Sequence, residues 1–143
     1  MVHQVDRRQM VADFLLDVWS DGKVDLCQNY IAASYKIHHD PGDPWDGQTL
    51  DVAAFKERVR QSRKPFPDQR FHVQEVLADG EAVAVTWLWS ATHLEDLPGF
   101  RASGRAVTMS GATVYYFDEQ NKISGHWQIV DRLGVYQQLR ASS

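Results

Sequence analysis

The chain has 143 residues, which is enough for one domain with a buried core and short for two. A hydrophobic share of 43% and a charged share of 24% are ordinary for a globular protein and exclude general disorder. The net charge of −4 gives no support for a nucleic-acid or an anionic-membrane partner. The single cysteine, Cys27, cannot form an intramolecular disulfide, and no apolar run approaches the roughly 18 residues of a membrane span. We therefore expect one cytoplasmic domain over residues 1–143 that contacts neither nucleic acid nor membrane.

The first half of the chain has the spacing of amphipathic helices. Residues 6–19 carry apolar side chains at helical intervals on one face, which predicts a helix. We predict a second, short helix over residues 24–32 and a third over residues 50–62. Between these two, residues 35–40 alternate as in a strand, and the segment 41–47, rich in proline and glycine, predicts a loop that could cover a cavity.

The second half of the chain is typical of long strands. These are expected at residues 71–77, 82–93, 106–117 and 123–130, before a C-terminal helix over 131–139. The dipeptide Asp79-Gly80 predicts a tight hairpin between the first two. Helices followed by an antiparallel meander indicate an α+β fold, in which a bent sheet can curl around the helices. The cone-shaped cavity so enclosed would be the natural ligand site.

Seven short segments occur in an order that matches a known family. They are residues 35–41, 66–68, 83–87, 92–93, 103–107, 125–134 and 137–139. Together they resemble the SnoaL-like polyketide cyclase family of the nuclear-transport-factor-2-like superfamily. This resemblance implies a cone-shaped α+β barrel, with N-terminal helices packed on a curved mixed or antiparallel sheet around a central cavity. It also implies a homodimer.

The resemblance further implies a reaction. Members of this family close rings by intramolecular aldol condensation of polyketide-derived or polycyclic carbonyl compounds, without metal or cofactor. An aspartate serves as acid and base, and the matching position here is Asp131. Related folds isomerise ketones, open epoxides, dehydrate or only bind small molecules, so these functions stay open as alternatives.

The residues around Asp131 allow two roles for its carboxylate. Trp127, Ile129 and Asp131 share one face of the last strand, and His126 lies on the other, where a structural role is expected unless a bulge reverses the faces. If Trp127 and Ile129 line the cavity, burial would raise the pKa of Asp131 toward a value useful for acid/base catalysis. Asp131 also precedes the C-terminal helix, where aspartate is a favoured N-cap.

His39 is the second candidate for catalysis. It shares a strand face with Tyr35 and precedes the loop that carries Trp45. A neutral imidazole there could bond a substrate carbonyl or work with Asp131; alternatively it is a core histidine bonded to backbone. A metal site at His39 and Asp40 lacks a third ligand, and there is no glycine-rich phosphate loop, so we expect neither metal nor cofactor.

Trp87, Trp89 and His93 share one face of the longest predicted strand. If this face looks inward, the indole rings could stack on a planar apolar or aromatic substrate. If it looks outward, it would suit a dimer interface, and alternation alone does not decide between the two. The residues expected to contact the substrate are Tyr35, Trp45, Trp87, Trp89, His93 and Trp127.

Overall fold

The structure, a computed structural model, describes residues 6–141. Its helical elements are α1 (Arg7–Phe14), the π-helical η1 (Leu15–Ser20), the 3-10 helix η2 (Val24–Leu26), α2 (Cys27–Tyr30), α3 (Val52–Arg63) and α4 (Arg132–Arg140). The strands are β1 (Ile31–His39), β2 (Thr49–Leu50), β3 (Arg70–Asp79), β4 (Ala82–Thr92), β5 (Ala106–Phe117) and β6 (Ile123–Val130). Among the described residues, no helix is long and apolar enough to cross a membrane.

The N-terminal helices follow the predicted pattern with two differences. Asp6 caps α1 by accepting hydrogen bonds from two backbone N–H groups, and the apolar face of this helix is buried. After Phe14 the helix continues as the six-residue π-helical segment η1. The helix predicted over residues 24–32 ends at Tyr30, because Ile31 already pairs with β6 and begins the sheet.

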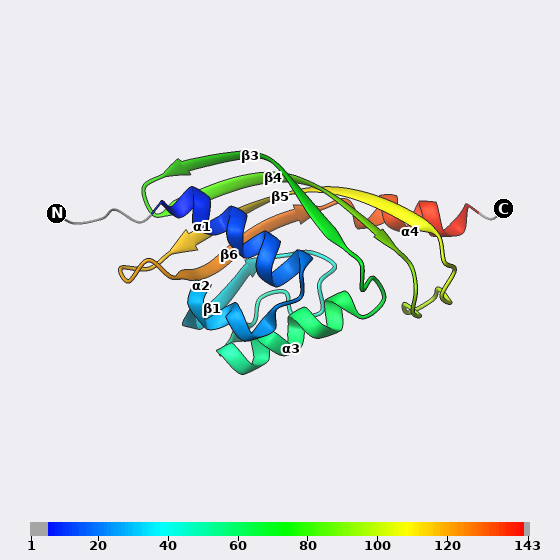
Figure 1. Cartoon of the computed structure of the whole chain (residues 1–143), viewed down its shortest axis with the longest axis horizontal. Helices are drawn as coiled ribbons and strands as arrows, with labels where there is room; N and C mark the ends of the chain where they lie inside the picture. The colour runs from blue at the N-terminus through cyan, green and yellow to red at the C-terminus, as the bar shows by residue number, and fades with distance from the viewer. Residues whose placement is uncertain (1–5, 142–143) are drawn as a thin grey trace.

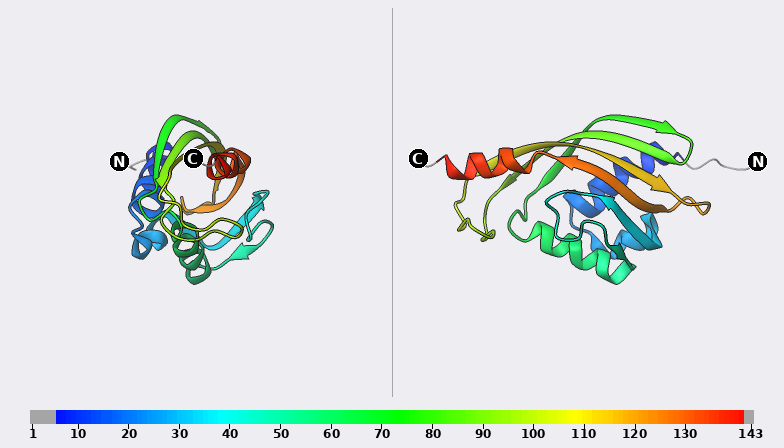
Figure 2. Two further views of the ribbon diagram at one scale, coloured as in Figure 1. Left: turned by 90° about the vertical axis from the view of Figure 1, so that its right-hand side faces the viewer. Right: turned by 180° about the vertical axis from the view of Figure 1, so that it is seen from behind.

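The six strands form one mixed sheet in the order β2-β1-β6-β5-β4-β3. Only the pair β1 and β6 is parallel; the other neighbours are antiparallel. The sheet arches over α1 and α3, which lie on its concave side (Figure 1). Seen from the end it curls around the interior without closing (Figure 2). This arrangement confirms the predicted α+β fold of helices packed on a curved sheet.

An aromatic cluster fixes α3 against the sheet. Phe55 of α3 is fully buried, and its ring centroid lies 4.7 Å from that of Tyr35 on β1 and 6.0 Å from that of Phe14 on α1. Burying three such rings contributes much of the hydrophobic stabilisation of this part of the core. Residues 40–51, which connect β1 to α3, are therefore attached at both ends to elements packed in the core.

An irregularity near the end of β1 decides which way its last residues face. Ile37 pairs with His126 and His39 with Trp127, so two steps along β1 correspond to one step along β6. The extra residue, His38, reverses the alternation of side chains beyond it, as a β-bulge does. As a result Asp40, directly after the strand, is fully buried.

Candidate active site

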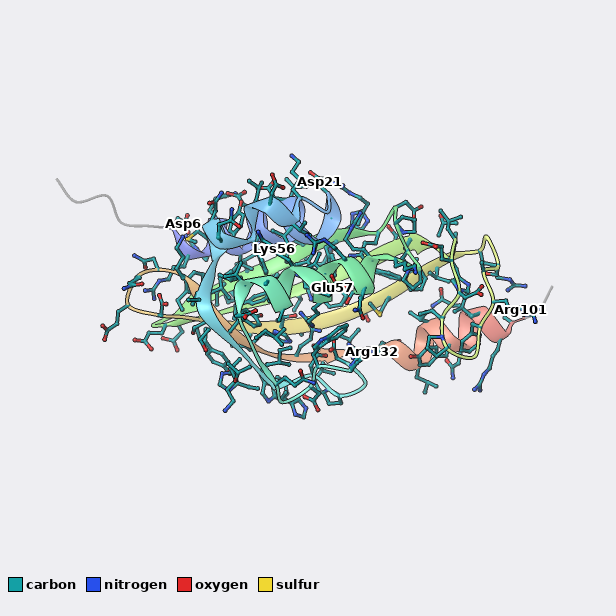
Figure 3. The ribbon with its side chains drawn as sticks, turned by 90° about the horizontal axis from the view of Figure 1, so that it is seen from below. Asp6, Asp21, Lys56, Glu57, Arg101 and Arg132 are labelled. Atoms are coloured by element: carbon teal, nitrogen blue, oxygen red, sulfur yellow. The ribbon has the colours of Figure 1, made fainter. Side chains whose placement is uncertain are left out.

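A cavity of about 1170 Å³ lies on the concave side of the sheet. Its wall is largely aromatic and apolar, and includes Trp19, Phe66, Phe71, Trp87, Trp89, Met109 and Tyr115. Exposed residues of α3, of the loop after β4 and of α4 also border the cavity, which places its opening among these elements. Glu57 on α3 and Arg132 at the start of α4, both labelled in Figure 3, mark two sides of it.

The two tryptophans of β4 offer a ligand ring surface rather than hydrogen-bond donors. Trp87 Nε1 donates to Thr113 Oγ1 at 3.0 Å, and Trp89 Nε1 donates to Gln69 Oε1 at 3.1 Å. The ring of Trp87 lies directly on Gly111, where an added Cβ would come within 2.3 Å of Trp87 Cζ2. Because both indole N–H groups are already bonded within the protein, the wall suits a flat apolar or aromatic ligand.

A carboxylate, an imidazole and a phenol form a buried chain of hydrogen bonds in this wall. His126 Nε2 lies 2.9 Å from Asp40 Oδ2, and His126 Nδ1 lies 2.6 Å from Tyr35 Oη. All three residues are at most 2% exposed. Since an ionised carboxylate only accepts, Nε2 carries the imidazole proton, and Nδ1 accepts from the Tyr35 hydroxyl. His126 and Tyr35 line the cavity, while Asp40 is outside its lining, on the far side of the imidazole.

The carboxylate of Asp40 is held by three further donors. Its Oδ2 atom accepts from Arg58 Nη2 at 3.2 Å and from Gln128 Nε2 at 3.1 Å, and its Oδ1 atom accepts from Arg132 Nη2 at 3.1 Å. Asp43, at 3.0 Å from Arg58 Nη2, is a second anion in the cluster. Two guanidinium groups and an amide thus fix the position of the Asp40 carboxylate.

These surroundings set the protonation states of the chain. Burial by itself would raise the pKa of Asp40, but the hydrogen bond from His126 and the charges of Arg58 and Arg132 outweigh it and hold that pKa below its ordinary value. Burial lowers the pKa of His126 below its ordinary value, although the bond to Asp40 opposes this. Burial also raises the pKa of Tyr35 well above its ordinary value. At neutral pH a neutral imidazole therefore lies between an ionised carboxylate and a protonated phenol.

This arrangement is equipped for proton transfer. The neutral imidazole can take the Tyr35 proton through the hydrogen bond at Nδ1, and the adjacent carboxylate stabilises the imidazolium that forms. Within residues 6–141, no three His, Cys, Asp or Glu side chains gather as metal ligands do. The carboxylate, imidazole and phenol of the chain are groups that carry out acid/base chemistry.

Comparison with known proteins identifies the family. The model of the SnoaL-like polyketide cyclase family matches residues 9–139. The crystal structure of a proposed polyketide cyclase from Acidithiobacillus ferrooxidans is 54% identical, with a TM-score of 0.92 and 100% of both chains covered. This chain belongs to the SnoaL-like polyketide cyclase family.

More distant structures share the fold of this SnoaL-like protein. IdmH, a proposed polyketide cyclase from Streptomyces antibioticus, is 22% identical with a TM-score of 0.78, over 94% of this chain and 99% of its own. AclR, a proposed hydroxylase from Streptomyces galilaeus, is 16% identical with a TM-score of 0.77, over 98% of this chain and 100% of its own. No curated protein matches. Since proteins with this fold are named for different reactions, the fold alone does not identify the reaction, which depends on the residues of the site.

Four of the six residues predicted to contact the substrate line the cavity of this SnoaL-like protein: Tyr35, Trp45, Trp87 and Trp89. The other two do not. His93 shares the inward face of β4 and is buried, but its Nδ1 atom bonds Ser103 Oγ at 2.9 Å outside the cavity lining. Trp127 is 41% exposed on the outward face of the sheet.

The two residues predicted to be catalytic also lie outside the cavity lining. Asp131 is exposed and caps α4, its Oδ1 atom accepting from the Gly134 backbone N–H at 2.9 Å. His39 stacks on Trp127 with ring centroids 4.7 Å apart, away from Tyr35, with which it was expected to share a face. The cause is the extra residue in β1, together with an outward orientation of the strand face that carries Trp127 and Asp131.

Three site residues were not recognised from the sequence. His126 does lie on the strand face opposite Asp131, as predicted, but this is the interior face. Asp40 turns inward only because of the extra residue in β1. Arg58 is a charged residue within an amphipathic helix, where a solvent-facing position is usual, yet it is only 4% exposed. Its position between the buried Phe55 and Val59, at the border of the apolar face, was the available signal.

Proposed function

We propose that this protein is a cofactor-independent acid/base enzyme that closes a ring in an aromatic or polyketide-derived carbonyl compound by an aldol-type reaction. The observation that carries the proposal is the buried chain from Asp40 through His126 to Tyr35, at the wall of an aromatic cavity. The family and the aromatic wall support an aromatic or polyketide-derived substrate, and the chain of hydrogen bonds supports acid/base catalysis.

Proton transfer through Tyr35 accounts for both halves of such a reaction. As the phenol oxygen takes a proton from the carbon next to a substrate carbonyl, the phenol's own proton moves to His126 Nδ1, and the electron pair of the broken C–H bond forms an enolate. The enolate carbon then attacks a second carbonyl carbon and forms the new C–C bond. The resulting alkoxide takes the Tyr35 proton, and the imidazolium returns its proton to the phenol oxygen. No charged phenolate has to persist, which agrees with the raised pKa of Tyr35.

The first step can be tested without knowing the natural substrate. 2-Tetralone is a flat bicyclic ketone with exchangeable hydrogens beside its carbonyl, and their replacement by deuterium in D2O is measurable by proton NMR. We expect the protein to accelerate this exchange in a saturable manner. A protein that is protected by the ketone against thermal unfolding, yet causes no exchange, would instead be a small-molecule binding module.

The pH dependence of the exchange reports on His126. Burial, only partly opposed by the bond to Asp40, lowers the pKa of His126 below 6.5, and the relay requires the neutral imidazole. After subtraction of the buffer rate, the catalysed rate should therefore rise with pH, reach half its maximum below pH 6.5, and stay level through pH 8. A rate that climbs steadily from pH 7 to 9 would show that His126 is not the titrating base.

We also propose that the protein is a homodimer that pairs through the outward face of the sheet. Leu88, Trp127 and Ile129 lie on this face and are 49%, 41% and 48% exposed. Apolar surface of this kind is seldom left uncovered on a monomer. Light scattering on a size-exclusion column should give the mass of a dimer for the wild type and of a monomer for I129E. A monomeric wild type at 100 micromolar would contradict the proposal.

A further inference from the structure

Arg58 has more hydrogen-bonding capacity than its protein partners use. Its Nη2 atom donates to Asp40 Oδ2 and to Asp43 Oδ2. Its Nε atom is buried and has no hydrogen-bond partner among the described residues. A buried donor without a partner costs free energy, so its retention needs an explanation. Arg58 also belongs to the lining of the cavity.

Arg58 is also adjacent to the group that moves the proton. Arg58 Nη2 and His126 Nε2 both bond the same oxygen atom, Asp40 Oδ2, at 3.2 and 2.9 Å. The guanidinium carbon lies 5.1 Å above the ring of Trp19 and 6.0 Å from the centre of the Phe55 ring. Stacked in this way, the guanidinium is held as a flat donor group beside the aromatic wall.

We infer that Arg58 binds the oxygen that becomes negatively charged when the substrate loses its proton, and that the cavity consequently favours flat aromatic ligands bearing an oxyanion. This inference rests on the proposed function and names a further catalytic residue for it. Asp40 and Asp43 balance Arg58 and Arg132 in the resting site, and the imidazolium formed during proton transfer balances the new enolate. A fixed cationic donor near that oxygen stabilises the enolate without reorganisation.

Two ligands that differ only in charge test the inference. 2-Naphthoate carries a conjugated oxyanion on a flat ring system, and 2-naphthamide has the same shape without the charge. Their dissociation constants can be measured by calorimetry or by quenching of tryptophan fluorescence. For the wild type we expect the carboxylate to bind at least about tenfold tighter than the amide, because hydrogen bonds to charged groups are the stronger ones. Equal affinities, a preference for the amide, or no binding of either would overturn the inference.

A pair of variants of the same helix assigns the preference to Arg58. R58Q should bind both naphthalene ligands with similar affinity. R60Q removes the same charge from an exposed arginine of α3 that pairs with Glu57, and it should keep the preference. If R60Q loses the preference and R58Q keeps it, the anion is attracted by the overall positive potential at the cavity opening, and the inference is wrong.

A third variant covers the case in which R58Q does not fold, as judged by near-ultraviolet circular dichroism. R58K keeps the charge beside Asp40 and Asp43 but lacks the flat set of donors, so the preference should fall several-fold. A full preference in R58K would contradict a guanidinium-specific site. The same measurements distinguish the inference from the proposed function. If the protein exchanges 2-tetralone but shows no preference for the carboxylate, only the inference about Arg58 is contradicted. If it prefers the carboxylate but exchanges no 2-tetralone, the proposed enzymatic function is contradicted.

Discussion

Replacing Tyr35 with phenylalanine is expected to slow the catalysed deuterium exchange of 2-tetralone by about two orders of magnitude or more. Tyr35 lines the cavity and its hydroxyl is hydrogen-bonded to His126 Nδ1, and a positioned acid/base group contributes roughly 10²- to 10⁴-fold. The ring remains, so the packing against Phe55 is preserved. The lost hydroxyl leaves His126 Nδ1 without its donor, which costs about 1–3 kcal/mol of stability. The rate is measured at pH 7.5 and saturating ketone.

The matched control is Y116F, the same substitution at a tyrosine of β5. Tyr116 packs its ring against His38, with centroids 5.1 Å apart, and is not part of the cavity lining. The Y116F variant should catalyse the deuterium exchange of 2-tetralone at the wild-type rate. H126Q removes the base itself and should lose as much activity as Y35F, and the double variant should lose little more, because both residues act in one chain. Additive losses would mean that Tyr35 and His126 act independently.

Asp131 offers a direct contrast between the interpretation of the sequence and that of the structure. The family resemblance assigns the acid/base role to Asp131, whereas the structure places it at the N-cap of α4. D131A should therefore cost about 1 kcal/mol of stability, the usual loss on removing an N-cap, and leave the exchange rate unchanged. If D131A abolishes exchange while Y35F retains it, Asp131 is the base and the proposed chain through Tyr35 is not used.

The fold was predictable because its signals are periodic. The helical spacing at the N-terminus and the alternation of the long strands both survive in the structure, and the strands predicted over residues 106–117 and 123–130 have the same bounds as β5 and β6. Periodicity depends on burial of whole faces, which many residues determine together. A single substitution changes little in such a pattern.

The site was less predictable because it depends on single residues. Alternation showed that His126 and Asp131 face opposite ways, but it gave no indication of which face is interior. One extra residue in β1 then exchanged the expected positions of His39 and Asp40. The partners that neutralise buried Arg58 come from the loop after β1 and are brought to α3 only by the folded chain. Pairings of this kind have no signature in a single sequence.

Replacing Asp40 with alanine is expected to cost about 3–5 kcal/mol of the free energy of unfolding at pH 7.5. The carboxylate is fully buried and accepts four hydrogen bonds, from Arg58, His126, Gln128 and Arg132. Its removal leaves Arg58 buried with Asp43 as its remaining anion, and breaking a buried ion pair on one side is among the most destabilising single changes. Urea unfolding followed by tryptophan fluorescence measures the loss. D25A, which removes an exposed aspartate, should change stability by less than about 0.5 kcal/mol.

The same variant tests the electrostatic account through its pH dependence. The pKa of Asp40 is held below 3.8 in the folded protein, so the unfolded chain binds its proton first as the solution is acidified. The contribution of Asp40 to stability is therefore complete above pH 3.8 and is lost as the pH falls through the folded pKa. The difference between wild type and D40A should stay constant between pH 7 and 8, where His126 is neutral, and the contribution of the Asp40 charge should be lost below pH 3.8. A difference that is independent of pH down to pH 3 would mean that D40A acts by creating a cavity, and that the charge of Asp40 does not hold the two arginines and His126 in place.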